Sequence, residues 1–382
     1  MSRKLFLKPL ALMACLLCSM SAVSQHTYAV YDSSNTTLTF YCDNNQDSRQ
    51  GTIYDLEASA YRPEWYYDDT NKSVTRVVFD PSFENARPTT TYSWFDYMSN
   101  LQSITGMNYL NTSEVTNMSD MFFSCSGLTS IDVSGFNTDK VTSMTRMFYG
   151  CSELTSLDLR NFNTENVITM NSMFAACDNL ASVDVSSFNT SNVVNMDGVF
   201  NYCVSLTDLD VSNFNTAKVT DMTGMFGNCR GLTRLDLTNF NTAQVTSMSY
   251  MFNYSDNLVA IFVGDNWSTD AVTWSRDMFR GCTSLVGRKG TEYDPDHIDA
   301  SYAHLDGGVE NPGYLSVRGL LGDVNDDGRI DISDVTALIH YVLSGDTTLI
   351  NIHNADMNSD FNVNVTDVTA LIHLVLNNGI PE

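Results

Sequence analysis

A segment near the C-terminus carries oxygen-bearing side chains at the spacing that a calcium loop requires. At positions 1, 3, 5, 9 and 12 of the segment stand Asp323, Asn325, Asp327, Asp331 and Asp334. Gly328 at position 6 permits a tight turn, and the backbone carbonyl of Arg329 at position 7 supplies a further oxygen. Calcium is bound by about six to eight oxygens of this kind, so the segment predicts a calcium site.

A second segment repeats this EF-hand-like ligand set 33 residues later. At the matching side-chain positions stand Asp356, Asn358, Asp360, Asn364 and Asp367. The carbonyl of Asn362 would take position 7, whereas Phe361 replaces the glycine of the tight turn and puts the geometry of this site in question. Each segment opens a stretch with one apolar helical face, so we expect two calcium ions beside two matched helices.

A column of aspartates recurs every 26 residues in the middle of the chain. Its members are Asp132, Asp158, Asp184, Asp210 and Asp236. In-register strands would bring these outward carboxylates about 5 Å apart, which is unfavourable for like charges. Two interpretations stay open. The carboxylates are solvated or bonded to neighbouring hydroxyls such as Ser130, Ser156 and Ser182, or they form an acidic ligand-binding strip.

A cysteine column has the same spacing and includes Cys125, Cys151, Cys177, Cys203 and Cys229. Stacked repeats would align these residues with parallel Cβ vectors, which is the wrong geometry for disulfides. Ser255 takes the same position in a further copy. We therefore expect buried, reduced thiols that pack as small hydrophobic side chains, rather than bridges or metal ligands.

The chain has no residue combination typical of an enzyme. All six histidines lie outside the repeats: His26, His297, His304, His340, His353 and His373. The repeats therefore contain no Ser-His-Asp or Cys-His pair, and the periodic aspartates lack the unequal environments that separate a general acid from a base. Phosphate-binding glycine loops and zinc-ligand spacings are also missing from the sequence, so we expect a protein without catalytic activity.

The columns belong to a long repeat. Its phenylalanine positions are Phe122, Phe148, Phe174, Phe200, Phe226 and Phe252, and methionine, cysteine and leucine columns keep the same step. The last unit places Trp274 in the methionine column and then slips by one residue to Phe279. Such a register indicates a solenoid of stacked coils, with the methionine and phenylalanine columns in its core.

One unit shows two periodicities. Five apolar residues recur at the intervals of a short helix with one buried face: Val141, Met144, Met147, Phe148 and Cys151. Leu157 and Leu159 flank Asp158 with the alternation of a short strand. We expect an α/β solenoid whose coils run helix, turn, strand, turn, and whose strands form a parallel sheet.

Charge and the N-terminal segment restrict the functional class. The chain has 382 residues and a net charge of -25, without the basic stripe that nucleic acid requires. Residues 1–24 have the basic start, apolar stretch and small residues of a secretory signal peptide. Lipidation of Cys15 is the alternative, although apolar residues continue beyond it. No other segment is apolar enough for a transmembrane helix, so we expect a secreted, cell-surface-associated protein.

The repeat motif, Met-Phe-x-x-Cys-x-x-Leu-x-x-Leu-Asp-Leu-x-x-Phe-Asn-Thr-x-x-Val-Thr-x-Met, resembles the BspA-type leucine-rich repeat of bacterial surface proteins. The resemblance covers roughly residues 90–287. It implies a β-rich N-terminal cap over residues 25–89 and adhesion to host matrix proteins or other bacteria. After the last repeat, residues 288–318 are expected to form a C-terminal cap and linker.

The two calcium segments and their helices resemble a type I dockerin module over residues 319–382. This resemblance implies a small all-α calcium-binding domain and a cohesin-bearing partner. Positions 10 and 11 of each loop contact cohesin in that family, and here these are Ile332, Ser333, Val365 and Thr366. Because the two pairs are similar, either half of the module could face the partner.

Two functional interpretations follow. In the first, the repeats of a secreted binding or adhesion protein bind an extracellular protein or glycan, and the dockerin-like module tethers the chain to a cohesin-like domain. In the second, the chain is a non-catalytic component of a polysaccharide-degrading, cellulosome-like assembly. Aromatic side chains exposed in line along the sheet would favour a glycan, whereas the outward strand positions, Ser, Asp, Thr and Arg, favour a protein ligand.

Overall fold

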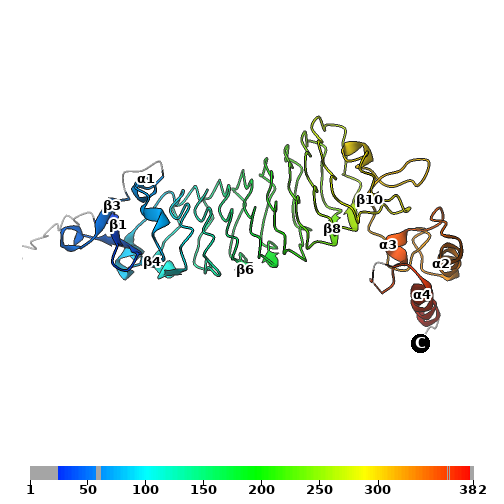
Figure 1. The fold of residues 1–382 in the computed structure, drawn as a ribbon, viewed down its shortest axis with the longest axis horizontal. Coiled ribbons are helices and arrows are strands. Elements are labelled where there is room, and N and C mark those ends of the chain that lie inside the picture. Colours follow the sequence, from blue (N-terminus) through cyan, green and yellow to red (C-terminus); the bar gives the residue numbers. More distant parts are fainter. Residues whose placement is uncertain (1–24, 57–61, 359, 361, 379–382) are drawn as a thin grey trace, which may run out of the picture.

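The computed structural model describes residues 25–56, 62–358, 360 and 362–378. The predicted signal peptide, Cys15 and Phe361 therefore lie outside the described residues. An N-terminal sheet, a long stack of coils and a group of helices follow one another along an elongated body (Figure 1). In the part of the chain that the structure describes, no helix is long and apolar enough to cross a membrane.

The N-terminal region is β-rich, as predicted. Its sheet has the order β3-β1-β2-β4-β5. The strands are β1 (His26–Asp32), β2 (Thr37–Asp43), β3 (Thr52–Asp55), β4 (Arg76–Phe79) and β5 (Ser103–Thr105), and the short helix α1 spans Glu64–Tyr67. β1 is antiparallel to β2 and β3, whereas β4 is parallel to β2 and β5. β5 follows the predicted end of the cap at residue 89, so the sheet continues beside the first coil.

The sheet closes the end of the array with aromatic side chains. Phe40 stacks on Phe79 and Trp94, with ring centroids 4.7 and 5.3 Å apart. Phe95 stacks on Phe122 of the next coil at 5.3 Å. The apolar core of the sheet is therefore continuous with the core of the array, which protects the first coil from water.

The phenylalanine and methionine columns lie in the core, as predicted. The rings of the phenylalanine column stack along the array with centroids between 5.5 and 6.0 Å apart, from Phe122 to Phe279. Met118, Met144, Met170, Met196, Met222 and Met248 are fully buried. Each coil thus buries its apolar side chains only against its neighbours, which is typical of repeat architectures.

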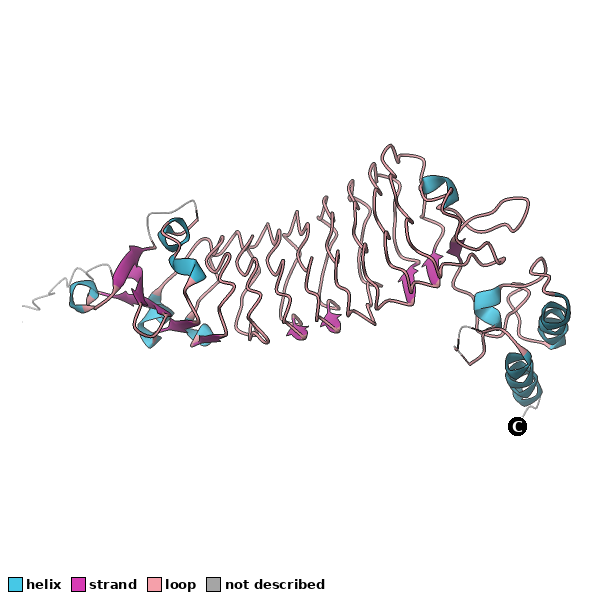
Figure 2. Cartoon of the chain, in the orientation of Figure 1, coloured by secondary structure: helices cyan, strands magenta, loops and turns pink. Residues whose placement is uncertain are grey.

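The helix predicted in each coil is wrong. The structure describes all of residues 90–287 and forms no α-helix there (Figure 2). Each coil instead makes consecutive turns in which two residues, four positions apart, adopt left-handed backbone conformations, such as Arg146 (φ 53°) and Gly150 (φ 70°). Left-handed residues at this spacing interrupt the i→i−4 hydrogen bonds of an α-helix.

The backbone of these turns forms hydrogen bonds between coils as well as within them. The Met147 N–H donates to the Met144 carbonyl at 3.2 Å, whereas the Phe148 N–H donates to the Met173 carbonyl of the next coil at 2.9 Å. The turns keep the apolar side chains on one inward face. A stripe of this spacing therefore suits stacked turns as well as a helix.

Strands form on the other side of some coils. They are β6 (Ser156–Asp158), β7 (Ser182–Asp184), β8 (Arg234–Leu237) and β9 (Ala260–Val263). β6 pairs with β7 and β8 with β9, both in parallel, which confirms the predicted direction of pairing. β10 (Leu315–Ser316) pairs in parallel with β9 and ends the array.

Trp274 does not lie in the methionine column, and the prediction that it does is wrong. It forms a parallel bridge with Ser247 and is 68% exposed. Val263 still pairs with Leu237 in the 26-residue register, so the extra residue of the last repeat precedes Trp274. This insertion moves Trp274 from the core to the surface.

The cysteine prediction is confirmed. All seven cysteines of the described residues are free and buried. The Cys151 Sγ donates to the Phe122 carbonyl at 3.2 Å, and the Cys177 Sγ makes the same bond to Phe148 at 3.1 Å.

Helices predominate after residue 331. They are α2 (Ile332–Ser344), α3 (Ile352–Ala355) and α4 (Val365–Asn378). A separate small core joins them and includes Val324, Leu338, Ile350 and Leu371. This helical module lies beyond the last coils at the C-terminal end of the body (Figure 1).

Candidate functional site

The first predicted calcium loop is folded around its own carboxylates. Asp323 accepts hydrogen bonds from the N–H groups of Asp327 at 3.0 Å and Gly328 at 2.9 Å. Asp334 accepts one from the Asn325 N–H at 3.1 Å. Positions 1 and 12 therefore both face into the loop, which is the arrangement that a shared ion would need.

Two ligand positions of each loop also start a helix. Asp331 is the N-cap of α2: it accepts the Ser333 N–H at 2.8 Å and donates its own N–H to Asp334 at 2.9 Å. This reciprocal pair is a capping box. Asn364 and Asp367 make the same connection at the start of α4, at 2.9 Å. The helices therefore hold positions 9 and 12 of both loops.

Among the described residues, the second loop repeats the connections of the first except one: its position-12 carboxylate accepts the N–H of position 2 instead of position 3. Asp356 accepts the Asp360 N–H at 3.1 Å, Asp367 accepts the Met357 N–H at 2.9 Å, and Asp360 accepts the Asn362 N–H at 2.8 Å. The side chain of Asn358 donates to Asp360 at 2.9 Å. The effect of Phe361 on this site remains a prediction, because that residue lies outside the described residues.

The donor set fits calcium. The carboxylates at positions 1 and 12, Asp323, Asp334, Asp356 and Asp367, are between 0% and 5% exposed. Burial raises the pKa of the Asp323 carboxyl, although the hydrogen bonds from the N–H groups of Gly328 and Asp327 act in the opposite direction. Buried carboxylates that face one another favour a cation, and hard oxygen donors match calcium. Among the described residues no group of three His, Cys, Asp or Glu side chains is placed to hold a metal as it stands.

The predicted partner-binding residues are all on the surface. Ile332 and Val365 are 69% and 64% exposed, and Ser333 and Thr366 are exposed beside them. Leu343, at the C-terminal end of α2, is 82% exposed. Large apolar side chains that remain in solvent on these helices are typical of a surface that is covered by a partner.

The aspartate column points outward and in register, with Asp158 opposite Asp184 across β6 and β7. Each aspartate accepts the N–H of the residue two positions on, at 2.9 to 3.2 Å; these donors are Ser134, Arg160, Ser186, Ser212 and Thr238. The hydroxyl partners are also these following residues, such as Ser186 at 2.6 Å. The predicted partners Ser130, Ser156 and Ser182 are not among them.

These bonds give the aspartates a structural role. Hydrogen bonds from Arg160 lower the pKa of Asp158 to about 2, and those from the following serine lower the pKa of Asp132, Asp184 and Asp210. An aspartate bonded to the backbone two residues on stabilises the turn that ends a strand. The acidic ligand strip stays a prediction, but one oxygen of each member is already engaged.

The end of the aspartate column lies in a groove of about 730 Å³ between the array and the helical module. Asp210 and Asp236 line it, and Arg318 of the linker forms an ion pair with Asp236. Arg234 of β8 forms a 3.0 Å ion pair with Asp356. The first ligand of the second loop therefore contacts the array directly.

His353 also joins the two parts. It is 5% exposed, its Nε2 lies 3.0 Å from the Val286 carbonyl, and its ring packs edge-on against Phe262 at 5.8 Å. Burial lowers its pKa to about 4. Sequence reasoning missed His353 and Arg234 because their partners are far away in the chain and no motif marks them.

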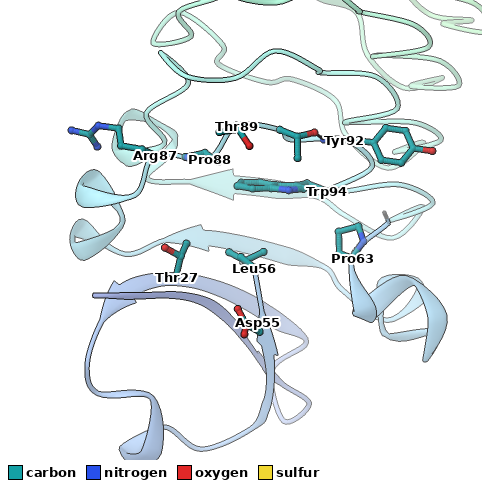
Figure 3. A pocket seen from close by; sticks show the side chains of 10 residues that line it. Thr27, Asp55, Leu56, Pro63, Arg87, Pro88, Thr89, Tyr92 and Trp94 are labelled. Atoms are coloured by element: carbon teal, nitrogen blue, oxygen red, sulfur yellow. Dashed lines mark hydrogen bonds between the residues drawn. The ribbon is translucent and has the colours of Figure 1, made fainter. Parts of the chain in front are cut away.

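A smaller cavity of about 320 Å³ lies at the N-terminal end (Figure 3). Thr27, Leu56 and Trp94 line it from different segments, and Asp55 is the single carboxylate among its described lining residues.

Comparisons with known proteins match two families over different parts of the chain. The family described as "Mycoplasma protein of unknown function, DUF285" matches residues 83–182 and 170–293. The family described as "Dockerin type I domain" matches residues 321–376. A search of the curated proteins found no match.

Two solved structures are similar to the chain. A leucine-rich repeat protein from Eubacterium ventriosum is 17% identical, with coverage of 69% of this chain and 82% of that one and a TM-score of 0.30. A leucine rich cell surface protein from Faecalibacterium prausnitzii is 14% identical, with coverage of 68% and 92% and a TM-score of 0.18.

Proposed function

Because the chain belongs to the DUF285 family through residues 83–293 and ends in a type I dockerin domain, we propose that it is an extracellular binding protein. Its BspA-like repeats bind a macromolecular ligand, and its dockerin tethers it to a cohesin-like partner at the cell surface or in an assembly. We assign it no catalytic activity. We also propose that the repeats form a capped solenoid and that the dockerin is an all-α module over residues 319–382.

The observation that carries the proposal is the match between the two calcium loops. Both loops bond the position-1 carboxylate to the N–H of position 5 and the position-12 carboxylate to the N–H of position 9, and both leave positions 10 and 11 exposed. We propose that each loop binds one calcium ion. The ion would neutralise the buried carboxylates and order the helix that follows.

Calcium removal tests the tether in the full chain. Between residues 90 and 287, all described, the structure forms no α-helix, so circular dichroism at 222 nm reports largely on α2 and α4. We expect EDTA to reduce this signal and calcium to restore it, because the buried carboxylates repel one another without a cation.

Matched variants separate the two loops. Asp334→Asn and Asp367→Asn each remove one position-12 carboxylate, and each should leave a single calcium-binding event by isothermal titration calorimetry. An unchanged 222 nm signal in EDTA, together with two unaltered binding events in both variants, would refute the calcium-dependent tether.

The second candidate function is a non-catalytic place in a polysaccharide-degrading assembly. One observation favours it: large aromatic side chains are exposed along the array, including Tyr202 and Trp274. Both candidates use the same tether, and they differ in what the array binds.

A further inference from the structure

The array exposes its large hydrophobic side chains on one side only. We define the turn face as the outward surface of the turn segments, which run from the valine to the cysteine position of each coil, as in residues 141–151. The large hydrophobic side chains exposed between residues 83 and 293 are Tyr97, Ile168, Val194, Tyr202, Tyr254 and Trp274. All of them lie on the turn face, and the strand side carries the aspartate column instead.

The residue type at one outward position of the turn face differs from coil to coil. The position after each core phenylalanine holds Phe123, Tyr149, Ala175, Asn201, Gly227, Asn253 and Arg280. The neighbouring inward column is phenylalanine throughout, because the stacked rings share one packing requirement. The outward position has no common residue: its side chains are half-buried or exposed in five coils, whereas Ala175 and Gly227 are buried.

Three exposed tyrosines occupy strained backbone positions. Tyr97, Tyr202 and Tyr254 have φ angles of 58°, 61° and 55°. They share the second left-handed position of their coils, where Gly150 and Asn228 stand in other coils. Bulky residues adopt this conformation at a cost that glycine avoids and asparagine reduces. Strain of this kind often marks a functional position.

The rings of the turn face leave surface for a ligand. Tyr202 and Trp274 are 52% and 68% exposed, and neither stacks on another ring or cation among the described residues. Tyr254 lies against Gly281 of the next coil, where an added Cβ would be 2.7 Å from its ring. Arg280 lies over the same ring, 5.8 Å from its centroid.

We propose that the turn face binds a linear, neutral glycan that lies along the array, with Tyr97, Tyr202, Tyr254 and Trp274 as its main contacts. This inference deepens the proposed function, because it names the ligand class and the face of the array that binds it.

The spacing of the rings favours an extended polymer. Consecutive coils are separated by ~4.8 Å, so Tyr254 follows Tyr202 by ~10 Å and Tyr202 follows Tyr97 by ~19 Å along the array. Side chains that dominate protein interfaces cluster near the centre of the contact. Here the three tyrosines instead share one column along the array, in which the coils between them place Ser124, Gly150, Ala176 and Asn228. Trp274 lies at a different position of its coil, in the column of Ser247.

The polarity of the face favours an uncharged ligand. Arg146 pairs with Asp120 at 2.8 Å, and Arg276 and Arg280 share Asp277 at 3.5 Å. The arginines are therefore paired within the face, and its acidic side chains without an ion pair among the described residues are Asp197 and Asp221. A sugar chain offers C–H faces that pack on aromatic rings and hydroxyl groups that bond amides and hydroxyls, which are the groups present here.

Affinity gel electrophoresis of the full chain in calcium tests the proposal. The gels contain hydroxyethyl cellulose, xyloglucan or galactomannan as neutral glycans, and polygalacturonate as a charged one. We expect retardation by at least one neutral glycan. Tyr202→Asn and Trp274→Ala should each weaken it at least about tenfold, whereas Tyr202→Phe should retain it.

The controls separate binding from folding. Asn228 occupies the same left-handed position as Tyr202, so Tyr202→Asn should not lower the melting temperature. Thr155→Ala, an exposed position on the strand side, should leave retardation unchanged. The calcium response at 222 nm should be intact in all variants. The calcium-dependent tether and the glycan site are therefore tested by separate measurements, and one proposal can be refuted without the other.

Three results would overturn the proposal. They are no retardation by any neutral glycan, retardation that Tyr202→Asn and Trp274→Ala leave intact, and stronger binding to polygalacturonate than to every neutral glycan. Capture of the chain by immobilised collagen or fibronectin that is lost in the same variants would assign the face to a protein ligand instead.

Discussion

At the scale of single residues, the cysteine column shows how one side chain serves both packing and hydrogen bonding. Cys203 donates its Sγ–H to the Phe174 carbonyl at 3.1 Å, and Ser255 donates its hydroxyl to the Phe226 carbonyl at 2.8 Å. The serine replaces the thiol in the same column and keeps the same type of acceptor. A small buried donor is therefore what this position requires.

This environment predicts unreactive thiols. Burial raises the pKa of Cys229 to about 12 and raises the pKa of Cys151, Cys177 and Cys203 as well. Since the thiolate is the reactive form, we expect no labelling of the folded chain by Ellman's reagent at pH 8. All thiols should react in guanidinium chloride without a reductant. Rapid labelling of the folded chain, or thiols that appear only after reduction, would contradict the buried, reduced ladder.

At the scale of the coil, a buried threonine joins each repeat to the next. The members of this column are Thr112, Thr138, Thr164, Thr190, Thr216 and Thr242, each at most 2% exposed. Thr190 donates its hydroxyl to the Asn215 carbonyl at 3.0 Å and accepts the Asn215 N–H at 2.7 Å. One side chain thus satisfies two backbone groups of the following coil.

Thr190→Val should therefore be costly. Valine keeps the shape of this fully buried side chain but removes the hydrogen-bond partner of the N–H and the carbonyl of Asn215, at a cost of about 1 to 3 kcal/mol. Urea unfolding, monitored by tryptophan fluorescence, measures the loss. Thr220→Val is the matched control, because Thr220 is exposed and Val194 occupies its column in the preceding coil; it should change stability by about 0.5 kcal/mol or less. Equal costs for both variants would show that the buried hydroxyl does not hold the coils together.

At the scale of the whole molecule, the dockerin is packed against the array rather than hanging from it. Arg234 pairs with Asp356 at 3.0 Å, and Arg288 pairs with Asp326 at 3.4 Å. The Ile352 N–H also donates to the Arg288 carbonyl at 3.2 Å. These contacts fix the orientation of the dockerin relative to the coils.

The junction should open in acid because of His353. Its pKa is lowered from 6.5 to about 4 in the folded chain, so the opened state binds the proton more readily between these values. The packed junction keeps its full stability above about pH 6.5 and loses it as the pH falls towards 4. A shift of this size corresponds to on the order of 3 kcal/mol. Small-angle scattering in calcium should show a larger molecule near pH 4.5 than at pH 7.

Two glutamine variants isolate this effect. His353→Gln removes the titrating group and should largely abolish the pH dependence, whereas His373→Gln changes an exposed histidine of α4 and should retain it. An expansion of the same size in both variants would assign the transition to the calcium ligands or to other carboxylates.

The local spacing of apolar residues predicted which side chains of each coil face inward, but it did not predict the backbone conformation of the coils. Val141, Met144, Met147 and Phe148 lie on one side of the chain, and both a helix and a series of turns place them there. The choice depends on the Phe148 N–H, which bonds the next coil. Trp274 was misassigned for a related reason, since only the pairing of Ser247 with Trp274 locates the inserted residue.

The sequence by itself determined the period, the core columns and the buried, unbridged cysteines, because each depends on residue types at fixed separations along the chain; the calcium ligand set stays a prediction from the same kind of spacing. Only the tertiary structure decided that the coils are built from left-handed turns, that the aspartates stabilise their own turns, and that the exposed rings gather on the turn face. The ion pair between Arg234 and Asp356 also depends on the tertiary structure. These features arise from contacts between coils and between domains, whose energies depend on which distant segments meet, and no local pattern encodes that.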